Sequence, residues 1–532
     1  MRGADILART LHEAGTRHVF ALSGNQIMPV FDAAPDAQLR FIHTRHEGAA
    51  GFMAEGYAQI TGTVGVALVT AGAGLGNAIS PMITARASQT PLLLMSGDSP
   101  VSRDGTGAFQ EMDQVAITSS LTKASRRIED PEQIASTLLE LLDIAQSGVP
   151  GPVHLALPED VMKADAGKQV EREAQSEAKS LPDTSALVEA LSTAQKPLVL
   201  AGPMFSPRRQ VSLVSELLER SVPAIVSESP RGLNDPALGV WQTLGREADL
   251  VVLLGKPVDF TLGFGSEAAW PKARWIVAHD DPRELDRARR NLGERLEQAI
   301  GDDPVAVSKA LSSALKMPGA DRTQWLELVA ELCAKRPEND AGRVSAGAIS
   351  PGMVAKAVMH SIDAQANPIL VCDGGEFGQW AQALINAPKR VINGISGAIG
   401  GGIGYAMGAR AALPDATVFA LMGDGTAGFH LPEFETAARE KLPFIAIIGN
   451  DRKWNAEHLI QMRDYGNDRM HGCTLSGARY DQAVAALGGF GVHVTAQSQL
   501  DDAIARSAEA VANGIPACIN VEIEGLPAPK LA

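Results

Sequence analysis

The residues best suited to chemistry follow two apolar runs in the last third of the chain. The first run ends in Gly423-Asp424-Gly425, and after 24 further residues the second ends in Asn450-Asp451. Glycines at the end of a strand let backbone N–H groups approach a phosphate. Because parallel strands present their carboxyl ends at one edge of a sheet, Asp424 and Asp451 can meet there on one cation. Oxygen ligands of this kind suit Mg²⁺ that bridges a diphosphate, so the pattern predicts a metal and diphosphate site.

A second group lies near the N-terminus, in the stretch Arg-His-Glu-Gly-Ala-Ala around Glu47. The small residues after Glu47 predict a helix that packs closely against its neighbours, with Glu47 near the N-terminal end. Taken alone, a glutamate at this position is usually a solvated helix start. A further segment, 70–77, is rich in glycine and ends in Asn77. It is a poor dinucleotide fingerprint, because its third glycine comes one residue early and no acid follows at the expected strand end.

Together these motifs resemble the thiamine-diphosphate-dependent enzymes of the acetohydroxyacid synthase and 2-hydroxyacyl-CoA lyase type, and the resemblance spans nearly the whole chain. It implies that Asp424, Asp451 and the backbone carbonyl of Lys453 hold Mg²⁺. The usual motif ends in Asn-Asn, so Asp451 is a departure that brings a further negative charge near the diphosphate. The resemblance also implies two catalytic residues: Glu47, which faces the aminopyrimidine of the cofactor, and Gln110, which donates to a substrate oxygen.

The resemblance assigns further residues to the cofactor. Ile399 stands where the family has a bulky apolar residue that bends the cofactor into a V shape, which places its 4′-amino group beside the reacting carbon. The residues implied to contact the cofactor are Gly74, Asn77, Gly374, Gly375, Glu376, Phe377, Ile399, Gly423, Asp424, Gly425 and Thr426.

The elements that must position these residues are short β-branched runs alternating with longer amphipathic stretches. The runs are 66–70, 91–96, 197–201, 224–226, 250–254, 275–278, 368–371, 418–422 and 444–448. Continuous apolar strands between helices indicate an α/β fold with parallel sheets covered on both faces. Two polar stretches, 164–185 and 316–350, are interpreted as linkers. We therefore expect three Rossmann-like domains: a pyrimidine-binding domain (1–163), a central domain (186–315) and a diphosphate-binding domain (350–532).

The central segment narrows the expected function. It lacks the element that carries FAD in acetohydroxyacid synthases, so FAD is not expected. Its stretch 255–265 resembles the 2-hydroxyacyl-CoA lyase branch instead. The leading prediction is a lyase or carboligase that acts on the carbon–carbon bond of a 2-hydroxyacyl-CoA. Two alternatives stay open: a 2-keto acid decarboxylase or acetolactate-synthase-like carboligase, and a cofactor-binding but catalytically idle partner, which the intact Glu47 argues against.

Composition and charge argue against nucleic-acid-binding and membrane-spanning proteins. The 532 residues carry a formal net charge of −15, which repels nucleic-acid phosphates. No apolar stretch approaches the roughly 18 residues of a membrane span. The four cysteines show no metal-binding spacing, which suits a reducing compartment. We therefore expect a cytoplasmic enzyme with a small-molecule substrate, no nucleic-acid or membrane partner, and self-association into a dimer or tetramer that completes the site.

Overall fold

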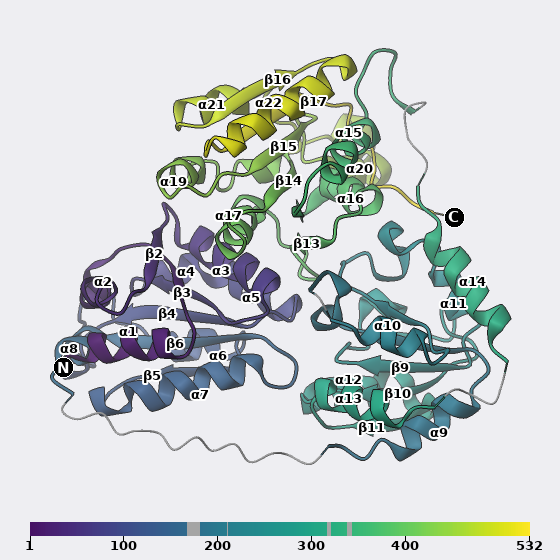
Figure 1. The fold of residues 1–532 in the computed structure, drawn as a ribbon, viewed down its shortest axis with the longest axis horizontal. Helices are drawn as coiled ribbons and strands as arrows, with labels where there is room; N and C mark the ends of the chain where they lie inside the picture. Colours follow the sequence, from purple (N-terminus) through teal and green to yellow (C-terminus); the bar gives the residue numbers. More distant parts are fainter. Residues whose placement is uncertain (167–180, 210, 317–320, 338–342, 532) are drawn as a thin grey trace. The chain divides into compact units, whose positions relative to one another are not determined.

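The computed structural model describes residues 1–166, 181–209, 211–316, 321–337 and 343–531. They form α/β structure with three sheets in which all pairings between the named strands are parallel. Two compact units are present. The first holds two six-stranded sheets and comprises Met1–Gln146 with residues 151–166 and 343–528, and the second holds the five-stranded sheet (Figure 1). The predicted fold class is thereby confirmed.

The first sheet has the strand order β2-β1-β3-β4-β6-β5. Its strands are β1 (His18–Ala21), β2 (Arg40–His43), β3 (Gly65–Val69), β4 (Leu92–Asp98), β5 (Ala124–Arg127) and β6 (Pro152–Pro158). Alternate residues of β3 enter different cores: Val66 and Leu68 pack with α1 (Gly3–Glu13) and α7 (Ile134–Gln146), whereas Ala67 and Val69 pack with α3 (Glu47–Thr61). A strand covered on both faces is apolar throughout, which explains why β3 was predictable.

The third sheet has the order β13-β12-β14-β15-β17-β16. Its strands are β12 (Pro368–Cys372), β13 (Lys389–Ile392), β14 (Thr417–Gly423), β15 (Ile445–Asn450), β16 (Phe490–Val494) and β17 (Ala517–Glu522). One face packs with α17 (Gly402–Ala412), and the other with α15 (Pro351–Asp363), α16 (Gly375–Leu384) and α22 (Leu500–Ala512).

Helices α3 and α17 join the first and third sheets into one core and lie side by side (Figure 1). Glycines make this contact possible. A Cβ atom on Gly56 would lie 2.7 Å from the carbonyl oxygen of Tyr405, and one on Gly408 would lie 2.0 Å from that of Met53. The prediction that the helix beginning at Glu47 packs closely is therefore confirmed.

A buried carboxylate reinforces the same contact. Glu55 of α3 has no exposed surface and accepts hydrogen bonds from the hydroxyls of Thr84 (2.5 Å), Ser88 (2.6 Å) and Tyr405 (3.0 Å). Because a buried carboxylate is costly without partners, this set of donors ties α5 (Ile79–Ala87), α3 and α17 together. The helix that begins with Glu47 is thus held rigidly.

The second unit has the strand order β11-β10-β9-β7-β8. Its strands are β7 (Pro197–Ala201), β8 (Ala224–Val226), β9 (Leu250–Leu254), β10 (Arg274–Ala278) and β11 (Leu296–Ile300). Helix α14 (Thr323–Ala334) packs on this unit through Trp325, whose indole N–H donates to the carbonyl of Pro197 at 2.8 Å. The packed part of the unit therefore extends beyond residue 315. Residues 167–180, 317–320 and 338–342 of the two predicted linkers lie outside the described residues.

In the described part of the chain, no helix combines the length and the apolar character that crossing a membrane requires.

A buried histidine sits in the first sheet. His154 of β6 has no exposed surface, its Nε2 lies 2.8 Å from the Ser96 hydroxyl, and its Nδ1 lies 2.9 Å from the Ser125 hydroxyl. Burial lowers its pKa from 6.5 to about 3. The imidazole is therefore neutral in the folded protein at neutral pH.

This pKa predicts an acid-sensitive step in stability. Above pH 6.5 the histidine is neutral in both the folded and unfolded states. As pH falls from 6.5 towards 3, the unfolded chain binds a proton that the folded chain refuses, and stability falls by up to about 1.4 kcal/mol per pH unit. We expect His154→Asn to flatten the fall of the thermal midpoint in this window, whereas His360→Asn, at an exposed position, keeps the wild-type slope. Equal slopes in all three proteins would contradict the assignment.

Candidate active site

The first half of the candidate site is built at the carboxyl edge of the first sheet. Glu47 is the first residue of α3, and the His46 side chain caps this helix by accepting from the Gly48 N–H at 3.0 Å. The Asn77 amide donates to Glu47 Oε2 at 2.9 Å. Asn77 ends α4 (Ala73–Asn77), which follows β3. Gly74 lies in the same turn, and a Cβ there would be 3.6 Å from Glu47 Oε1. The structure therefore brings together Glu47, Asn77 and Gly74.

Gln110 belongs to the same half-site through a chain of side chains. Gln26 donates to Gln110 Oε1 at 2.7 Å, and the Thr70 hydroxyl donates to Gln26 Oε1 at 2.7 Å. The Gln110 backbone has φ +60° and passes Gly72, whose Cβ would be 3.2 Å from that of Gln110. A left-handed conformation at a residue other than glycine is strained and is typical of functional sites.

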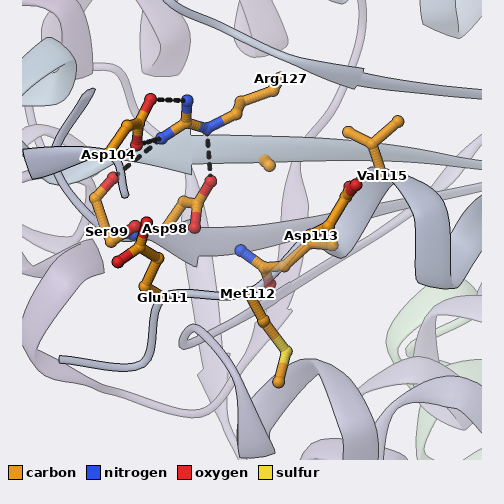
Figure 2. A pocket seen from close by; sticks show the side chains of 10 residues that line it. Asp98, Ser99, Asp104, Glu111, Met112, Asp113, Val115 and Arg127 are labelled. Atoms are coloured by element: carbon orange, nitrogen blue, oxygen red, sulfur yellow. Dashed lines mark hydrogen bonds and ion pairs between the residues drawn. The ribbon is translucent and has the colours of Figure 1, made fainter. Parts of the chain in front are cut away.

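The residues after Gln110 line a pocket of about 430 Å³ (Figure 2). Glu111 accepts from the N–H groups of Gly105, Gly107 and Ala108, which lowers the pKa of its carboxyl group. These bonds hold the loop that carries Gln110.

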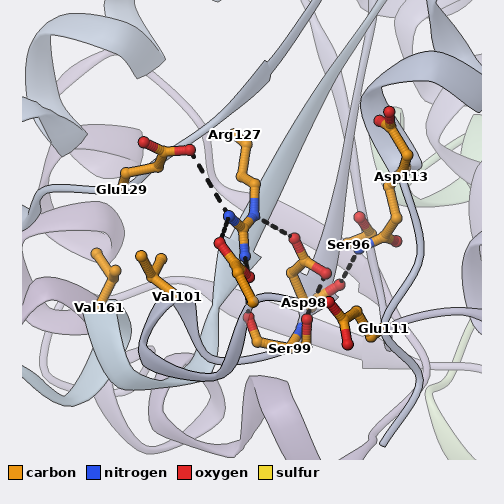
Figure 3. Close-up of polar contacts among 12 residues, drawn as sticks. Ser96, Asp98, Ser99, Val101, Glu111, Asp113, Arg127, Glu129 and Val161 are labelled. Carbon is orange, nitrogen blue, oxygen red and sulfur yellow. Dashed lines mark hydrogen bonds and ion pairs between the residues drawn. The ribbon is translucent and has the colours of Figure 1, made fainter. Parts of the chain in front are cut away.

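The wall of this pocket is an ion-pair cluster centred on Arg127. The guanidinium lies 2.7 Å from both Asp98 and Asp104 and 3.6 Å from Glu129; Figure 3 shows it between Asp98 and Glu129. The carboxylates raise the pKa of Arg127, which stays charged. The cluster closes the carboxyl end of β4 and β5 beside the loop.

The second half of the site lies at the carboxyl edge of the third sheet. Strands β14 and β15 pair in parallel with Gly423 opposite Gly449, so Asp424 and Asp451 leave the sheet side by side. Both oxygens of Asp424 are buried, and neither makes a hydrogen bond of good geometry with the described residues, although the N–H groups of Gly425 and Arg452 and the Asp451 carboxyl group lie near enough to favour its ionised form. Burial raises the pKa of Asp424 to about 6, and burial together with the neighbouring Asp424 raises that of Asp451 to about 7. The two carboxylates are therefore neighbours at this edge of the sheet, and their shared role in holding a cation stays a prediction.

The turn around Asp424 is tightly built. The Thr426 hydroxyl donates to the Gly423 carbonyl at 2.9 Å, and the Tyr480 hydroxyl donates to the Asp424 carbonyl at 2.9 Å. A Cβ on Gly425 would meet the Trp454 ring at 2.5 Å, so glycine is required there. The carboxylate of Asp424 is thus fixed in place before any ligand binds.

Asp373 organises the remaining turns, a role that the sequence analysis did not assign. It is fully buried and accepts from the N–H groups of Gly374 (2.7 Å), Gly400 (3.0 Å) and Gly402 (2.9 Å). Burial raises its pKa to about 6, against the effect of these donors. As a result, Ile399 lies beside Gly374. A Cβ atom on Gly374 would be 2.6 Å from Ile399 Cγ2. An aspartate two residues after the apolar run 368–371 was the available signal.

Two of the residues implied to contact the cofactor make other contacts. The Glu376 carboxylate accepts from the Ala528 N–H, and the Phe377 ring packs where a Cβ on Gly449 would lie, 2.6 Å from its Cγ. Gly375, with φ +86°, begins α16 and leaves open space around its Cα. At this turn the backbone of Gly374 and Gly375 is therefore better placed for a ligand than the two side chains after it.

The donor set around Asp424 fits Mg²⁺ held together with a diphosphate. Among the described residues no three His, Cys, Asp or Glu side chains form a metal cluster by themselves. Asp424 and Asp451 supply two carboxylates, and the Lys453 N–H donates to Asp451 Oδ1 at 3.1 Å. Mg²⁺ prefers few protein ligands combined with phosphate oxygens and water. The two buried oxygens of Asp424, neither of which makes a hydrogen bond of good geometry with the described residues, are the observation that favours such a cation.

The residues just before α3 also contact residues that follow β14 of the third sheet. The Arg45 N–H donates to Glu433 at 3.0 Å, and the rings of His46 and His430 lie 5.3 Å apart. In the described part of the chain, Glu47 itself shares no hydrogen bond with Asp424. One chain therefore presents two half-sites that do not bond to each other directly.

Comparison with known proteins agrees with this geometry. Residues 1–117 match the family model "Thiamine pyrophosphate enzyme, N-terminal TPP binding domain", and residues 373–521 match "Thiamine pyrophosphate enzyme, C-terminal TPP binding domain". A probable acetolactate synthase of Mycobacterium bovis is 30% identical over 98% of this chain and 95% of its own length. The 2-hydroxyacyl-CoA lyase 2 of Homo sapiens is 29% identical over 98% of this chain and 90% of its own, and that of Bos taurus is 30% identical over 93% and 86%.

The first match covers Glu47, Asn77 and Gln110, and the second covers Asp373, Asp424 and Asp451. Both half-sites thus fall inside the segments that the family models describe. The chain belongs to the thiamine-pyrophosphate-dependent enzyme family, whose members among its relatives are lyases and acetolactate synthases.

Proposed function

We propose that this enzyme is a lyase that cleaves the bond between C1 and C2 of 2-hydroxyacyl-CoA thioesters, releasing an aldehyde from C2 onward and, after a proton adds to C1, formyl-CoA, with thiamine diphosphate and Mg²⁺ as cofactors. The observation that carries the cofactor assignment is the buried Asp424 carboxylate beside Asp451. When bound, thiamine diphosphate supplies an electron sink next to the bond that breaks. The family relationship supports thiamine diphosphate, and the donor set supports Mg²⁺.

Each candidate site residue has a distinct proposed role. Asp424, Asp451 and the Lys453 carbonyl would hold Mg²⁺ against the diphosphate. Glu47 would hold a proton at its carboxyl group opposite the aminopyrimidine, and Asn77 fixes that carboxyl group. Ile399 would support the bent cofactor beside the turn at Gly374. Gln110 would donate a hydrogen bond to a substrate oxygen.

The choice of a CoA thioester is supported by the stretch 255–265 of the second unit. There the fully buried Lys256 ammonium lies 2.7 Å from the Thr261 hydroxyl and 3.1 Å from Asp259, which makes the turn rigid. Phe260 and Phe264 project from it and are 52% and 59% exposed. The support for a CoA thioester is the resemblance of this stretch to the lyase branch, together with the 2-hydroxyacyl-CoA lyases among the relatives.

An acetolactate-synthase-like carboligase is the second candidate, because the bacterial relative with that name is as similar as the lyases. The screen that decides between them offers the holoenzyme 2-hydroxyacyl-CoA thioesters and, separately, pyruvate. Aldehyde release from the thioesters supports the lyase. Acetolactate formation with no thioester cleavage would overturn it in favour of the carboligase. A visible absorption spectrum tests the expected lack of FAD.

We further propose that a second copy of the chain completes the site. Large apolar side chains are exposed near both half-sites: Phe109, Met112 and Ile117 near Gln110, and Phe429, Ile460, Met462 and Tyr465 after the Asp424 and Asp451 turns. Phe109 and Tyr465 are 74% and 68% exposed. Exposed apolar side chains near both half-sites favour an interface between copies of the chain, which would associate as a dimer or tetramer.

The metal assignment predicts coupled loss of both cofactors. Asp424→Ala removes a carboxylate that fixes the cation, so calorimetry should show weaker binding of thiamine diphosphate and Mg²⁺ together. The control Asp415→Ala removes an exposed acid in the turn before β14 and should bind both normally. Asp451→Asn restores the family's usual residue and should also retain binding. Normal binding by Asp424→Ala would rule out the metal site.

The role of Glu47 predicts loss of turnover without loss of cofactor. Glu47→Gln keeps the side-chain volume and can still meet Asn77, but it cannot hold the exchangeable proton. We expect turnover to fall by about 10²- to 10⁴-fold, as for other general acid–base residues. Calorimetry should show thiamine diphosphate still bound. Full turnover would contradict the assignment.

The shared site predicts complementation between two inactive variants. Glu47→Gln and Asp424→Ala damage different half-sites. When the two are mixed and allowed to exchange subunits, half of the dimers are mixed and each has one intact site. Activity should therefore recover to about a quarter of wild type. Mixtures that stay as inactive as the separate variants, despite proven subunit exchange, would show that each chain completes its own site.

A further inference from the structure

A buried glutamine stands behind the predicted substrate-side residue. Gln26 is 3% exposed and follows β1, far in sequence from Gln110. Its Nε2 donates to Gln110 Oε1 at 2.7 Å, and its Oε1 accepts from the Thr70 hydroxyl at 2.7 Å. The two carboxamides and the hydroxyl form one chain of hydrogen bonds in which each group has a defined direction.

The direction of this chain decides what Gln110 offers to a ligand. Because Gln26 Oε1 is occupied by Thr70, its amino group is the part that faces Gln110. In this arrangement the Gln110 carbonyl oxygen turns inward and accepts. Its amino group is left as a hydrogen-bond donor and makes no bond in the described part of the chain. Without Gln26, the Gln110 carboxamide could rotate by 180° and offer an acceptor instead.

The backbone around Gln110 is held in place, so rotation of its carboxamide group is the main motion that remains to the side chain. Its main chain is held at φ +60° against Gly72, and Glu111 anchors the loop by three backbone N–H groups. Gln26 is confined as well, since a Cβ on Gly97 would lie 2.9 Å from Gln26 Cβ. Both side chains thus start from fixed positions.

The chain of bonds also reaches the turn that holds Glu47. Thr70 begins the segment that contains Gly74 and Asn77. A Cβ on Gly74 would lie 2.8 Å from Thr70 Cγ2 and 3.6 Å from Glu47 Oε1. The donor of Gln110 and the carboxyl group of Glu47 are therefore held by one turn, which fixes their spacing.

We infer that Gln26 is a positioning residue that orients the Gln110 carboxamide so that its amino group faces a substrate carbonyl oxygen. The inference rests on the proposed function, in which Gln110 binds substrate. Both candidate substrate classes, CoA thioesters and 2-keto acids, carry such an oxygen. A site that offers a donor there favours these substrates over analogues that lack the acceptor.

The test is Gln26→Glu, which preserves volume and still accepts from Thr70. Its carboxylate cannot donate to Gln110 Oε1, so the Gln110 carboxamide turns over and presents its oxygen to the substrate. With whichever substrate class the wild type converts, we expect kcat/KM to fall by about 10- to 100-fold, mainly through KM. Gln26→Met, which makes neither bond and imposes no direction, should lose less. The matched control is Gln133→Glu, which adds the same charge at an exposed position of the first unit.

Two readouts separate positioning from a general structural role. Exchange of the C2 proton of bound thiamine diphosphate with deuterium depends on Glu47 and should stay at the wild-type rate in Gln26→Glu, as should the thermal midpoint. In the Gln110→Ala background, Gln26→Glu should cause no further loss.

Each outcome decides a claim. Unchanged kcat/KM in Gln26→Glu, with a fall in Gln110→Ala, overturns the inference alone. Slower proton exchange, or a further loss in the Gln110→Ala background, assigns Gln26 to holding the turn and also overturns it. A wild-type holoenzyme that converts neither substrate class overturns the proposed function and this inference with it.

Discussion

The candidate site depends on two neighbouring carboxylates at the ends of β14 and β15, of which Asp424 is buried and Asp451 partly buried. The negative charge of Asp424 opposes ionisation of Asp451. Such a pair is unfavourable by itself, because buried charges of one sign repel and lack solvation. A divalent cation removes both costs. The tight turn at Gly423-Asp424-Gly425, held by Tyr480 and closed by Trp454, fixes Asp424 in this unfavourable arrangement, which the proposed cation would relieve.

The rest of the first unit positions the other candidate site residues. Parallel sheets place the ends of successive strands on one edge, and each edge here carries a glycine-rich turn. The close packing of α3 on α17 and the buried Glu55 join the two sheets into one core. Glu47 begins α3, so its position follows from that packing. The same packing leaves exposed apolar side chains near both half-sites, which is the physical basis for proposing a shared site.

The sequence was informative where burial or glycine requirements were local. β7, β8 and β9 match the predicted runs because apolar residues fill them completely. Gly425 was singled out through the Gly423-Asp424-Gly425 motif, and the structure adds that only glycine fits there beside Trp454. The edge strands β2 and β13, which include arginine or lysine, were not predicted, and neither were the buried strands β6 and β17, whose apolar runs are interrupted by His154 and Asn520. Contacts between distant side chains were also beyond reach. Neither the bond between Gln26 and Gln110 nor the three backbone bonds of Asp373 follow from any spacing in the chain. The metal and cofactor roles of the site residues stay predictions.

The most direct test of the account is anomalous diffraction from crystals grown with thiamine diphosphate and Mn²⁺ in place of Mg²⁺. We expect one manganese peak at about 2 Å from carboxylate oxygens of both Asp424 and Asp451, with diphosphate oxygens completing the coordination. The Glu47 nearest to the bound aminopyrimidine should belong to a second copy of the chain. A cofactor bound with no metal at Asp424, or a manganese ion held elsewhere, would contradict the central claim that these two carboxylates are buried to receive a cation.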